Sequence, residues 1–313
     1  MSGEWSKRIG EQGENSVKRL LDLLGWAPLL ANYDIPCSYP KDHGTSETGR
    51  HRRQHGLDGS FKYSCPLVDG TQQHAVVSVK YSNDRYPTEG KLGKKFGEYY
   101  PSLSQMCVCY ERSPEYASLT AADDFASRFP VSGVLFWLNH CQEDDEASIF
   151  PALASTRPDA DPVPTFIVDN HQAAFLYDSV AFIRRNYGAS YYFNYQSTGK
   201  NLDSRTRRHK GSILPLQMLN SPEVVFRVES SEKILVICSK SAFSESDLKR
   251  LCDLAQILTL AWTTKVVIAF RAFDELREGQ AATKVRQMFS GNDGLQGLAI
   301  HSLQDSFRRE DPT

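Results

Sequence analysis

The fold is decided by residues 55–81, HGLDGSFKYSCPLVDGTQQHAVVSVKY, in which two apolar segments flank an Asp69-Gly70 pair. An Asp-Gly pair between two such segments is a strong signal for a β-hairpin. A tight turn at Asp69-Gly70 would set Asp58 opposite Tyr81, and one additional loop residue would set it opposite Lys80. We therefore expect an acid and a lysine to lie on one face at the open end of this hairpin.

A second acid is expected from a helix that precedes the hairpin. The apolar residues from Ile9 to Leu24 follow the 3.6-residue helical period, and Gly25 is a typical stop signal. Glu14 lies three residues before Val17, at the border of the apolar stripe. Glu14 can therefore point toward the hairpin.

These side chains suit phosphodiester hydrolysis. That reaction needs a divalent cation that polarises the phosphoryl oxygen and lowers the pKa of the attacking water, and Mg²⁺ prefers a few carboxylates plus water molecules. Asp58 and Glu14 can supply the carboxylates, while Lys80 would orient or deprotonate the water and offset the charge on phosphorus. Ser78 shares the strand face of Lys80, because strand side chains alternate with period 2. The pattern predicts a metal-dependent nuclease site.

This arrangement resembles the PD-(D/E)XK, or restriction-endonuclease-like, superfamily, which has an acid on the first helix, an acid at the start of a hairpin and an acid-x-lysine on the next strand. Glu14, Asp58 and Lys80 match, whereas Ser78 stands where the family usually carries Glu or Asp. The resemblance implies catalysis by Glu14, Asp58, Ser78 and Lys80, and Mg²⁺ or Mn²⁺ held by Asp58 and Glu14. Glu98, on a later predicted helix, is the candidate for a migrated acid, with Glu14 as the alternative.

The chain as a whole is similar to the nuclease component of two-gene GAPS-type phage-defence systems. The similarity rests on the segments 10–14, 55–59 and 78–82, and on a separate C-terminal part. It implies a prokaryotic cytoplasmic nuclease that works with a second, separately encoded defence protein, as a homodimer or hetero-oligomer.

Charge restricts how nucleic acid could bind. The net charge of −2 excludes binding by bulk attraction, so local basic patches are required. Two patches flank the acidic residues in sequence, which suits a phosphate backbone passing over a metal, and a third lies far downstream. The residues expected to contact nucleic acid are Arg52, Arg53, Lys94, Lys95, Arg205, Arg207, Arg208 and Lys210.

Composition indicates a cytoplasmic protein. The longest apolar runs are far below the roughly 20 residues that a membrane span needs, and the N-terminal residues do not resemble a signal peptide. The seven cysteines form no Cys-x-x-Cys pair, which argues for reduced, buried thiols and against a disulfide framework or zinc ribbon. We expect His43, His51 and His55 to be surface or phosphate-contacting histidines rather than metal ligands.

The order of predicted elements favours an α/β protein, with a restriction-endonuclease-like mixed sheet flanked by helices and a smaller C-terminal α/β unit. A long polar loop over 37–56 leads into the hairpin, followed by a helix near 91–109, strands at 131–138 and 165–168, and a helix near 173–186. We expect a nuclease domain over 1–195, a basic linker over 196–220 and an accessory domain for oligomerisation or partner binding over 221–313. Residues 191–195 either stack nucleobases or form an aromatic edge strand packed on the core, and we favour the strand.

Other catalytic motifs are missing. Residues 198–201 lack the upstream glycine of a P-loop and the Ser or Thr that follows its lysine, and neither a nucleophile elbow nor a zinc-protease motif occurs. Three functions remain: a DNA endonuclease, an RNA-directed nuclease on the same scaffold, and a catalytically silent nucleic-acid-binding or assembly subunit. We favour the first, because the resembled superfamily acts mainly on DNA.

Overall fold

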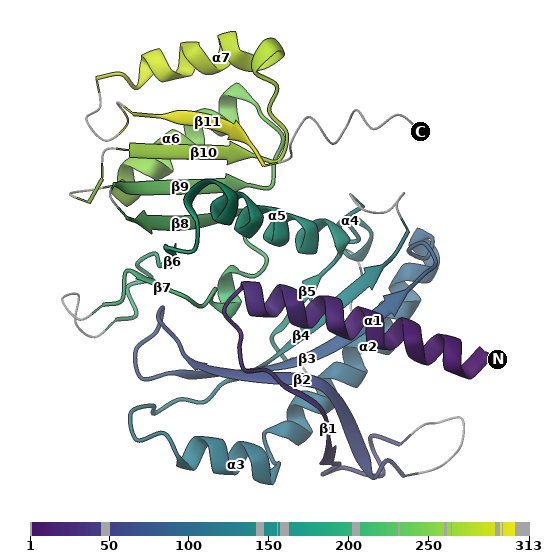
Figure 1. The fold of residues 1–313 in the computed structure, drawn as a ribbon. Helices are drawn as coiled ribbons and strands as arrows, with labels where there is room; N and C mark the ends of the chain where they lie inside the picture. Colours follow the sequence, from purple (N-terminus) through teal and green to yellow (C-terminus); the bar gives the residue numbers. More distant parts are fainter. Residues whose placement is uncertain are drawn as a thin grey trace. The chain divides into compact units, whose positions relative to one another are not determined.

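The chain forms two compact units, each built around one β-sheet (Figure 1). A computed structural model describes residues 2–44, 51–141, 147–154, 156, 163–201, 207–230, 232–259, 262–263, 265–291, 295 and 297–303. The first unit comprises residues 1–174 and 200–202, and the second comprises residues 175–199 and 203–313. The division therefore falls at residue 174 and not at 195, and the segment expected to be a linker contributes strand β7 to the second sheet.

The first unit contains the expected mixed sheet, with strand order β1-β2-β3-β4-β5. Its strands are β1 (Leu30–Pro36), β2 (Gln54–Ser64), β3 (Gln72–Ser82), β4 (Val131–Asn139) and β5 (Thr165–Val168). The pairs β1–β2 and β2–β3 are antiparallel, whereas β3–β4 and β4–β5 are parallel. Every residue of β4 is buried, as expected for a parallel strand covered on both faces.

Helices cover both faces of this sheet. They are α1 (Ser2–Leu23), α2 (Glu89–Tyr110), α3 (Pro114–Ala121) and α4 (Phe150–Leu153). Trp26, just after α1, stacks on Phe61 with ring centroids 5.4 Å apart. The next residue of β2, Lys62, is paired with His74, whose ring lies against Tyr110 of α2. Because successive strand residues point to opposite faces, α1 and α2 lie on opposite sides of the sheet.

The β2–β3 hairpin is present, but its register differs from the prediction. Gly59 pairs with Val77, so Asp58 lies next to the Ser78 position, and the predicted pairing with Tyr81 or Lys80 is wrong. The loop is longer than a tight Asp-Gly turn: it spans residues 65–71 and closes with a hydrogen bond from the Cys65 amide to the Thr71 carbonyl at 2.8 Å. Pro66 has no N–H, so the ladder cannot continue through it.

The second unit is the expected C-terminal α/β unit, with a six-stranded sheet of order β11-β10-β9-β8-β6-β7. Its elements are α5 (Asn170–Tyr187, which begins in the first unit), β6 (Tyr191–Asn194), β7 (Lys210–Gly211), η2 (Leu216–Met218), β8 (Glu223–Glu229), β9 (Lys233–Ser239), α6 (Glu245–Thr259), β10 (Lys265–Phe270), α7 (Glu275–Met288) and β11 (Ala299–Ser302). A buried apolar cluster joins α6 and α7 to one face of the sheet. Within the described ranges, no helix combines the length and apolar character needed to cross a membrane.

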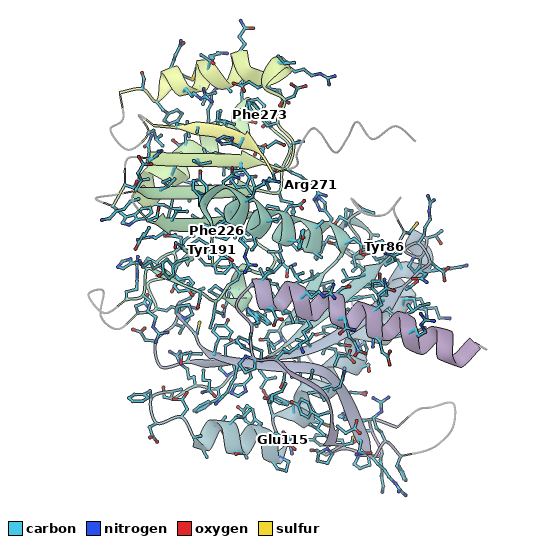
Figure 2. The ribbon with its side chains drawn as sticks, viewed as in Figure 1. Tyr86, Glu115, Tyr191, Phe226, Arg271 and Phe273 are labelled. Carbon is cyan, nitrogen blue, oxygen red and sulfur yellow. The ribbon has the colours of Figure 1, made fainter. Side chains whose placement is uncertain are left out.

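The aromatic segment at β6 is structural. Tyr191 packs edge-on against Phe226 with ring centroids 5.7 Å apart (Figure 2), and Phe193 is buried. The strand pairs with β8 on one side and β7 on the other, so it is an inner strand and not the edge strand that the sequence predicts. Only Tyr192 of this strand is exposed, and Lys210 Nζ lies 4.5 Å from its ring centroid.

A buried polar chain links β3 to α2. His74 is fully buried, with Nδ1 3.1 Å from the Tyr110 hydroxyl and Nε2 2.9 Å from Gln72 Oε1. The side-chain nitrogen of Gln72, Nε2, in turn donates to the Asp123 carboxylate. Burial, reinforced by the positive charge of Lys62, lowers the pKa of His74 to about 4. His74 is therefore neutral in the folded protein near pH 7.

We expect this histidine to make the fold acid-sensitive. Its folded pKa lies below its unfolded value of about 6.5, so its stabilising contribution is complete above pH 6.5 and is lost as pH falls toward 4. At pH 5 the loss is about 2 kcal/mol. Urea unfolding at pH 7 and pH 5 should show a smaller pH-dependent loss in His74→Gln than in the wild type. An equal loss in both proteins would assign the acid sensitivity to other groups.

Candidate active site

The approach of α1 to β3 is set by a glycine. A Cβ on Gly13 would lie 2.4 Å from Cβ of Tyr81 and 2.6 Å from its Cγ, closer than any side chain can pack. Glycine therefore lets α1 rest directly on β3, one residue beyond Lys80. This contact places the neighbouring acid, Glu14, near the carboxyl end of β3.

Asn32 on β1 connects Glu14 to the hairpin. Its side-chain nitrogen donates to Glu14 Oε2 at 3.1 Å. The flanking pairs of β1 and β2 are Ala31 with Gly59 and Tyr33 with Leu57, so Asn32 lies across from Asp58, but this pair is left out of the ladder. Asn32 has φ of 53°, in the left-handed region that asparagine tolerates better than most residues. The backbone distortion at Asn32 therefore lies beside both acids. Asn32 is hydrogen-bonded to Glu14, and it lies across from Asp58 in the sheet.

Asp58 is fixed beside the Ser78–Lys80 segment. The Val79 amide donates to Asp58 Oδ2 at 2.6 Å, a short charge-assisted bond in the place of regular ladder pairing. Ser78, at 2% exposure, is buried, and Lys80 is half-buried. Lys80 Nζ lies 5.7 Å from the ring centroid of Tyr99, on the α2 face of the sheet.

The structure thus brings the predicted residues to one region without joining all of them directly. Asp58 accepts a hydrogen bond from the amide of Val79, the residue between Ser78 and Lys80 on β3. Glu14 accepts a hydrogen bond from Asn32, which lies across from Asp58. Ser78 and Lys80 share a face, as predicted, because their β4 partners Leu135 and Trp137 both belong to the cluster under α2. Two carboxylates, a buried hydroxyl and a lysine near one strand end can hold a hard cation and a water molecule.

Glu98 lies on an exposed part of α2. Its side chain is 48% exposed, and Oε2 accepts from Lys95 Nζ at 2.9 Å. This bond raises the pKa of Lys95. In the described part of the chain, Glu98 does not join Glu14 and Asp58 in a group close enough to share one ion.

The predicted nucleic-acid-binding residues of the first unit differ in their surroundings. Arg53 and Lys94 are exposed, whereas Lys95 is paired with Glu98. Arg52 is half-buried, with Nη1 3.3 Å from His55 Nδ1. Arg53 and Lys94 are therefore the residues of this set with the fewest local constraints on their side chains.

The third basic patch belongs to the second unit. Lys210 forms an ion pair with Glu229 and lies over Tyr192, and Arg207 Nη2 is 2.8 Å from His209 Nδ1. Arg208 is exposed. Arg205 lies outside the described residues.

Two positions in this region have roles that were not predicted. Asn32 and Gly13 carry no catalytic chemistry, and their importance comes from a positive φ and a close helix–strand contact. The run from Gly10 to Glu14, with two glycines inside a predicted helix, contains a signal for such a contact, because glycine in a helix interior is otherwise unfavourable.

The predicted surface location of the loop histidines is wrong for His55, which is 2% exposed. His43 is half-buried, and His51 is exposed. His43 and His55 face each other and two cysteines, in a group that contains none of the predicted catalytic acids.

The first unit matches a known family. A family model described as the GAPS4 protein PD-(D/E)XK nuclease domain matches residues 1–172, more than half of the 313 residues. The matched range ends two residues before the boundary of the first unit. No curated protein and no solved structure is similar enough to the chain to count as a match.

Alanine substitutions in α1 should distinguish two effects on the free energy of unfolding: the close contact of Gly13 with Tyr81 and the low helix propensity of glycine. In Gly13→Ala the new methyl group collides with Tyr81, so α1 must move away from β3, and we expect the free energy of unfolding to fall by about 1–3 kcal/mol. A methyl group on Gly10, in the same helix, would meet no packed neighbour within 4 Å, and Gly10→Ala should stabilise by about 0.5–1 kcal/mol. Urea unfolding of both variants measures the difference, and similar changes in the two would contradict the proposed contact.

Proposed function

The chain belongs to the GAPS4 family of PD-(D/E)XK nucleases, and on this basis we propose that it is a metal-dependent DNA endonuclease acting in anti-phage defence. The observation that carries the proposal is the hydrogen bond from the Val79 amide to Asp58, which holds an acid between Ser78 and Lys80. Asp58 and Lys80 are the two residues that match the hairpin positions of the superfamily pattern.

The donor atoms suit a hard divalent cation. PD-(D/E)XK nucleases generally use divalent metals, and carboxylate and hydroxyl oxygens are the ligands that Mg²⁺ and Mn²⁺ prefer. Asp58 would bind through Oδ1, because Oδ2 accepts from Val79, and Glu14 would be the second ligand. When bound, the cation supplies Lewis acidity and a water molecule of lowered pKa.

Lys80 would assist the attacking water. Its ammonium group points toward helix α2, where Nζ lies 5.7 Å from the ring centroid of Tyr99. An ammonium held by an aromatic ring and not by a carboxylate keeps its hydrogens available to a water molecule or a phosphoryl oxygen. Lys80 would therefore orient the water and offset the negative charge that develops on the phosphate.

DNA is the proposed substrate because the superfamily acts mainly on DNA, and RNA is the alternative on the same scaffold. Exposed Arg53 and Lys94 would contact the phosphate backbone. We also propose that the nuclease works in the cytoplasm with a second defence protein, as a homodimer or hetero-oligomer. The free state of all seven cysteines is consistent with a reducing compartment.

Ser78 favours a second candidate function, a catalytically silent nucleic-acid-binding or assembly subunit. It replaces the usual acid, and the residue is buried at 2% exposure, where a carboxylate would otherwise contribute a full negative charge. In that case the chain would bind nucleic acid without cutting it. The two functions differ in a single measurable property, metal-dependent cleavage.

The test is cleavage by the purified protein, alone and with the product of the neighbouring gene. Linear DNA, circular DNA and RNA are each incubated with Mg²⁺, Mn²⁺ or EDTA. We expect DNA cleavage that requires the metal and falls about 100-fold or more in Asp58→Asn and Lys80→Ala, because each removes a group needed at the reacting phosphate. Glu14→Gln should show a comparable loss.

Matched controls exist on α1. Lys18 and Asp22 are exposed residues of the same helix as Glu14, and Lys18→Ala and Asp22→Asn should keep full activity. Binding to the same DNA, measured by fluorescence anisotropy, should survive in Asp58→Asn. Binding without cleavage in every wild-type condition would support the silent subunit, and preferential cutting of RNA would replace DNA as the substrate.

A further inference from the structure

Four metal-binding side chains meet at a place that the nuclease chemistry does not use. Cys37 follows β1, His43 lies in the next turn, His55 is the second residue of β2, and Cys109 is in the last turn of α2. One ligand atom from each lies within 4.8 Å of all the others. Among the described residues, this is the only group of histidine, cysteine and acidic side chains with such spacing.

The distances between these atoms match the edges of a tetrahedral zinc site. With Zn–S near 2.3 Å and Zn–N near 2.0–2.1 Å, tetrahedral geometry puts two nitrogens about 3.3 Å apart and a nitrogen and a sulfur about 3.6 Å apart. His43 Nδ1 lies 3.3 Å from His55 Nε2. It also lies 3.4 Å from each of the sulfurs of Cys37 and Cys109. Three edges of a coordination tetrahedron are therefore already present.

Hydrogen bonding alone does not account for this arrangement. His43 Nδ1 has either one hydrogen or one in-plane lone pair, so it can satisfy one partner well, yet three potential partners surround it at nearly equal distances. Cys37 and His55 are buried, at 8% and 2% exposure, and Cys109 is fully buried. One ion bound by all four groups would satisfy these converging polar atoms together.

We propose that Cys37, His43, His55 and Cys109 bind one structural Zn²⁺ ion. Two thiolates and two imidazoles form a soft, closed four-ligand set, which favours zinc over Mg²⁺ and leaves no position for a substrate or a reactive water. The ion would fasten residues 37–44, together with the first residues of β2, to the end of α2.

Backbone contacts surround the ligand side chains. The Ser38 amide donates to Cys109 Sγ at 3.4 Å. Backbone bonds hold the loop in place, from the Cys37 amide to the Arg53 carbonyl at 2.9 Å and from the His43 amide to the Tyr39 carbonyl at 2.9 Å. Such outer contacts orient the ligands of metal sites.

Arg52 is the neighbour that must respond to the ion. Its guanidinium lies 3.3 Å from His55 Nδ1 and can only donate. With Nε2 bound to zinc, the neutral ring carries its hydrogen on Nδ1, so Arg52 must turn away from His55. Arg52→Gln, whose side-chain oxygen can accept from Nδ1, should therefore bind zinc at least as tightly as the wild type.

The first measurement is the metal content of the full-length protein, purified without chelator after expression in zinc-supplemented medium. We expect one zinc per chain by elemental analysis. Cys37→Ser and Cys109→Ser should each lose it, whereas Cys65→Ser, at another buried and free cysteine, should retain it. Asp58→Asn should also retain it, which separates this site from the nuclease site. Zinc lost equally from all four variants would overturn the assignment.

A second measurement does not depend on variants that fold poorly. Replacement of zinc by Co²⁺ in the wild-type protein should give the intense visible bands of tetrahedral cobalt and the near-ultraviolet thiolate-to-metal bands. Chelation should lower the unfolding midpoint, and zinc should restore it. Absence of bound zinc together with absence of these cobalt bands would refute the proposal. A Cys37–Cys109 disulfide found by mass spectrometry in the freshly purified protein would refute it as well.

Discussion

The pairing of Gly59 with Val77 is the constraint on which the candidate active site depends. It ends the regular β2–β3 ladder one residue after Asp58, so the Asp58 carboxylate can accept the Val79 amide hydrogen. A slip of one residue would turn every side chain of β2 to the opposite face and would carry Asp58 away from Lys80. The apolar residues on both faces of β2 and β3 oppose such a slip, because each face is covered by a helix. The hydrophobic core therefore sets the position of the acid.

Two local departures from regular structure complete the region. Asn32 adopts a positive φ opposite Asp58, and Gly13 allows α1 to touch β3 beside Lys80. Neither residue provides reactive chemistry, yet each determines where Glu14 can reach. A positive φ at a non-glycine residue and a glycine inside a helix are both unfavourable, and they persist only where the surrounding structure enforces them. Here both lie beside the predicted catalytic residues.

The sequence predicts the long, periodic elements well and the connections poorly. Strands β4 and β5 and helices α2 and α5 appear within a few residues of their predicted bounds, because continuous burial and helical periodicity are strong local signals. β1 was not predicted, since five of its residues are exposed and its pattern hardly alternates. The hairpin register could not be predicted, because it depends on how residues 65–71 close the loop.

The same limit applies to side-chain clusters. Glu14, Asp58, Ser78 and Lys80 were predicted from their spacing along adjacent elements, and their catalytic roles stay predictions. The cysteine–histidine cluster was not predicted, because Cys109 lies 66 residues after His43 and comes from a different element. Spacing motifs detect ligands that one loop presents, whereas this group forms only when α2 packs on the sheet.

Two kinds of metal chemistry can coexist in the first unit because their ligands differ in softness and exposure. The oxygen atoms of Asp58 and Glu14 suit a hard cation that retains water, while the sulfur and nitrogen atoms around His43 suit a soft ion that excludes it. His55 precedes Asp58 by only three residues on β2, so an ion at His55 would restrain the strand that carries the acid. Such a restraint would reduce the motion of Asp58 without contact with the reacting phosphate. A site with two carboxylates, in which Ser78 replaces the third acid, depends most on the precise placement of its metal ligands.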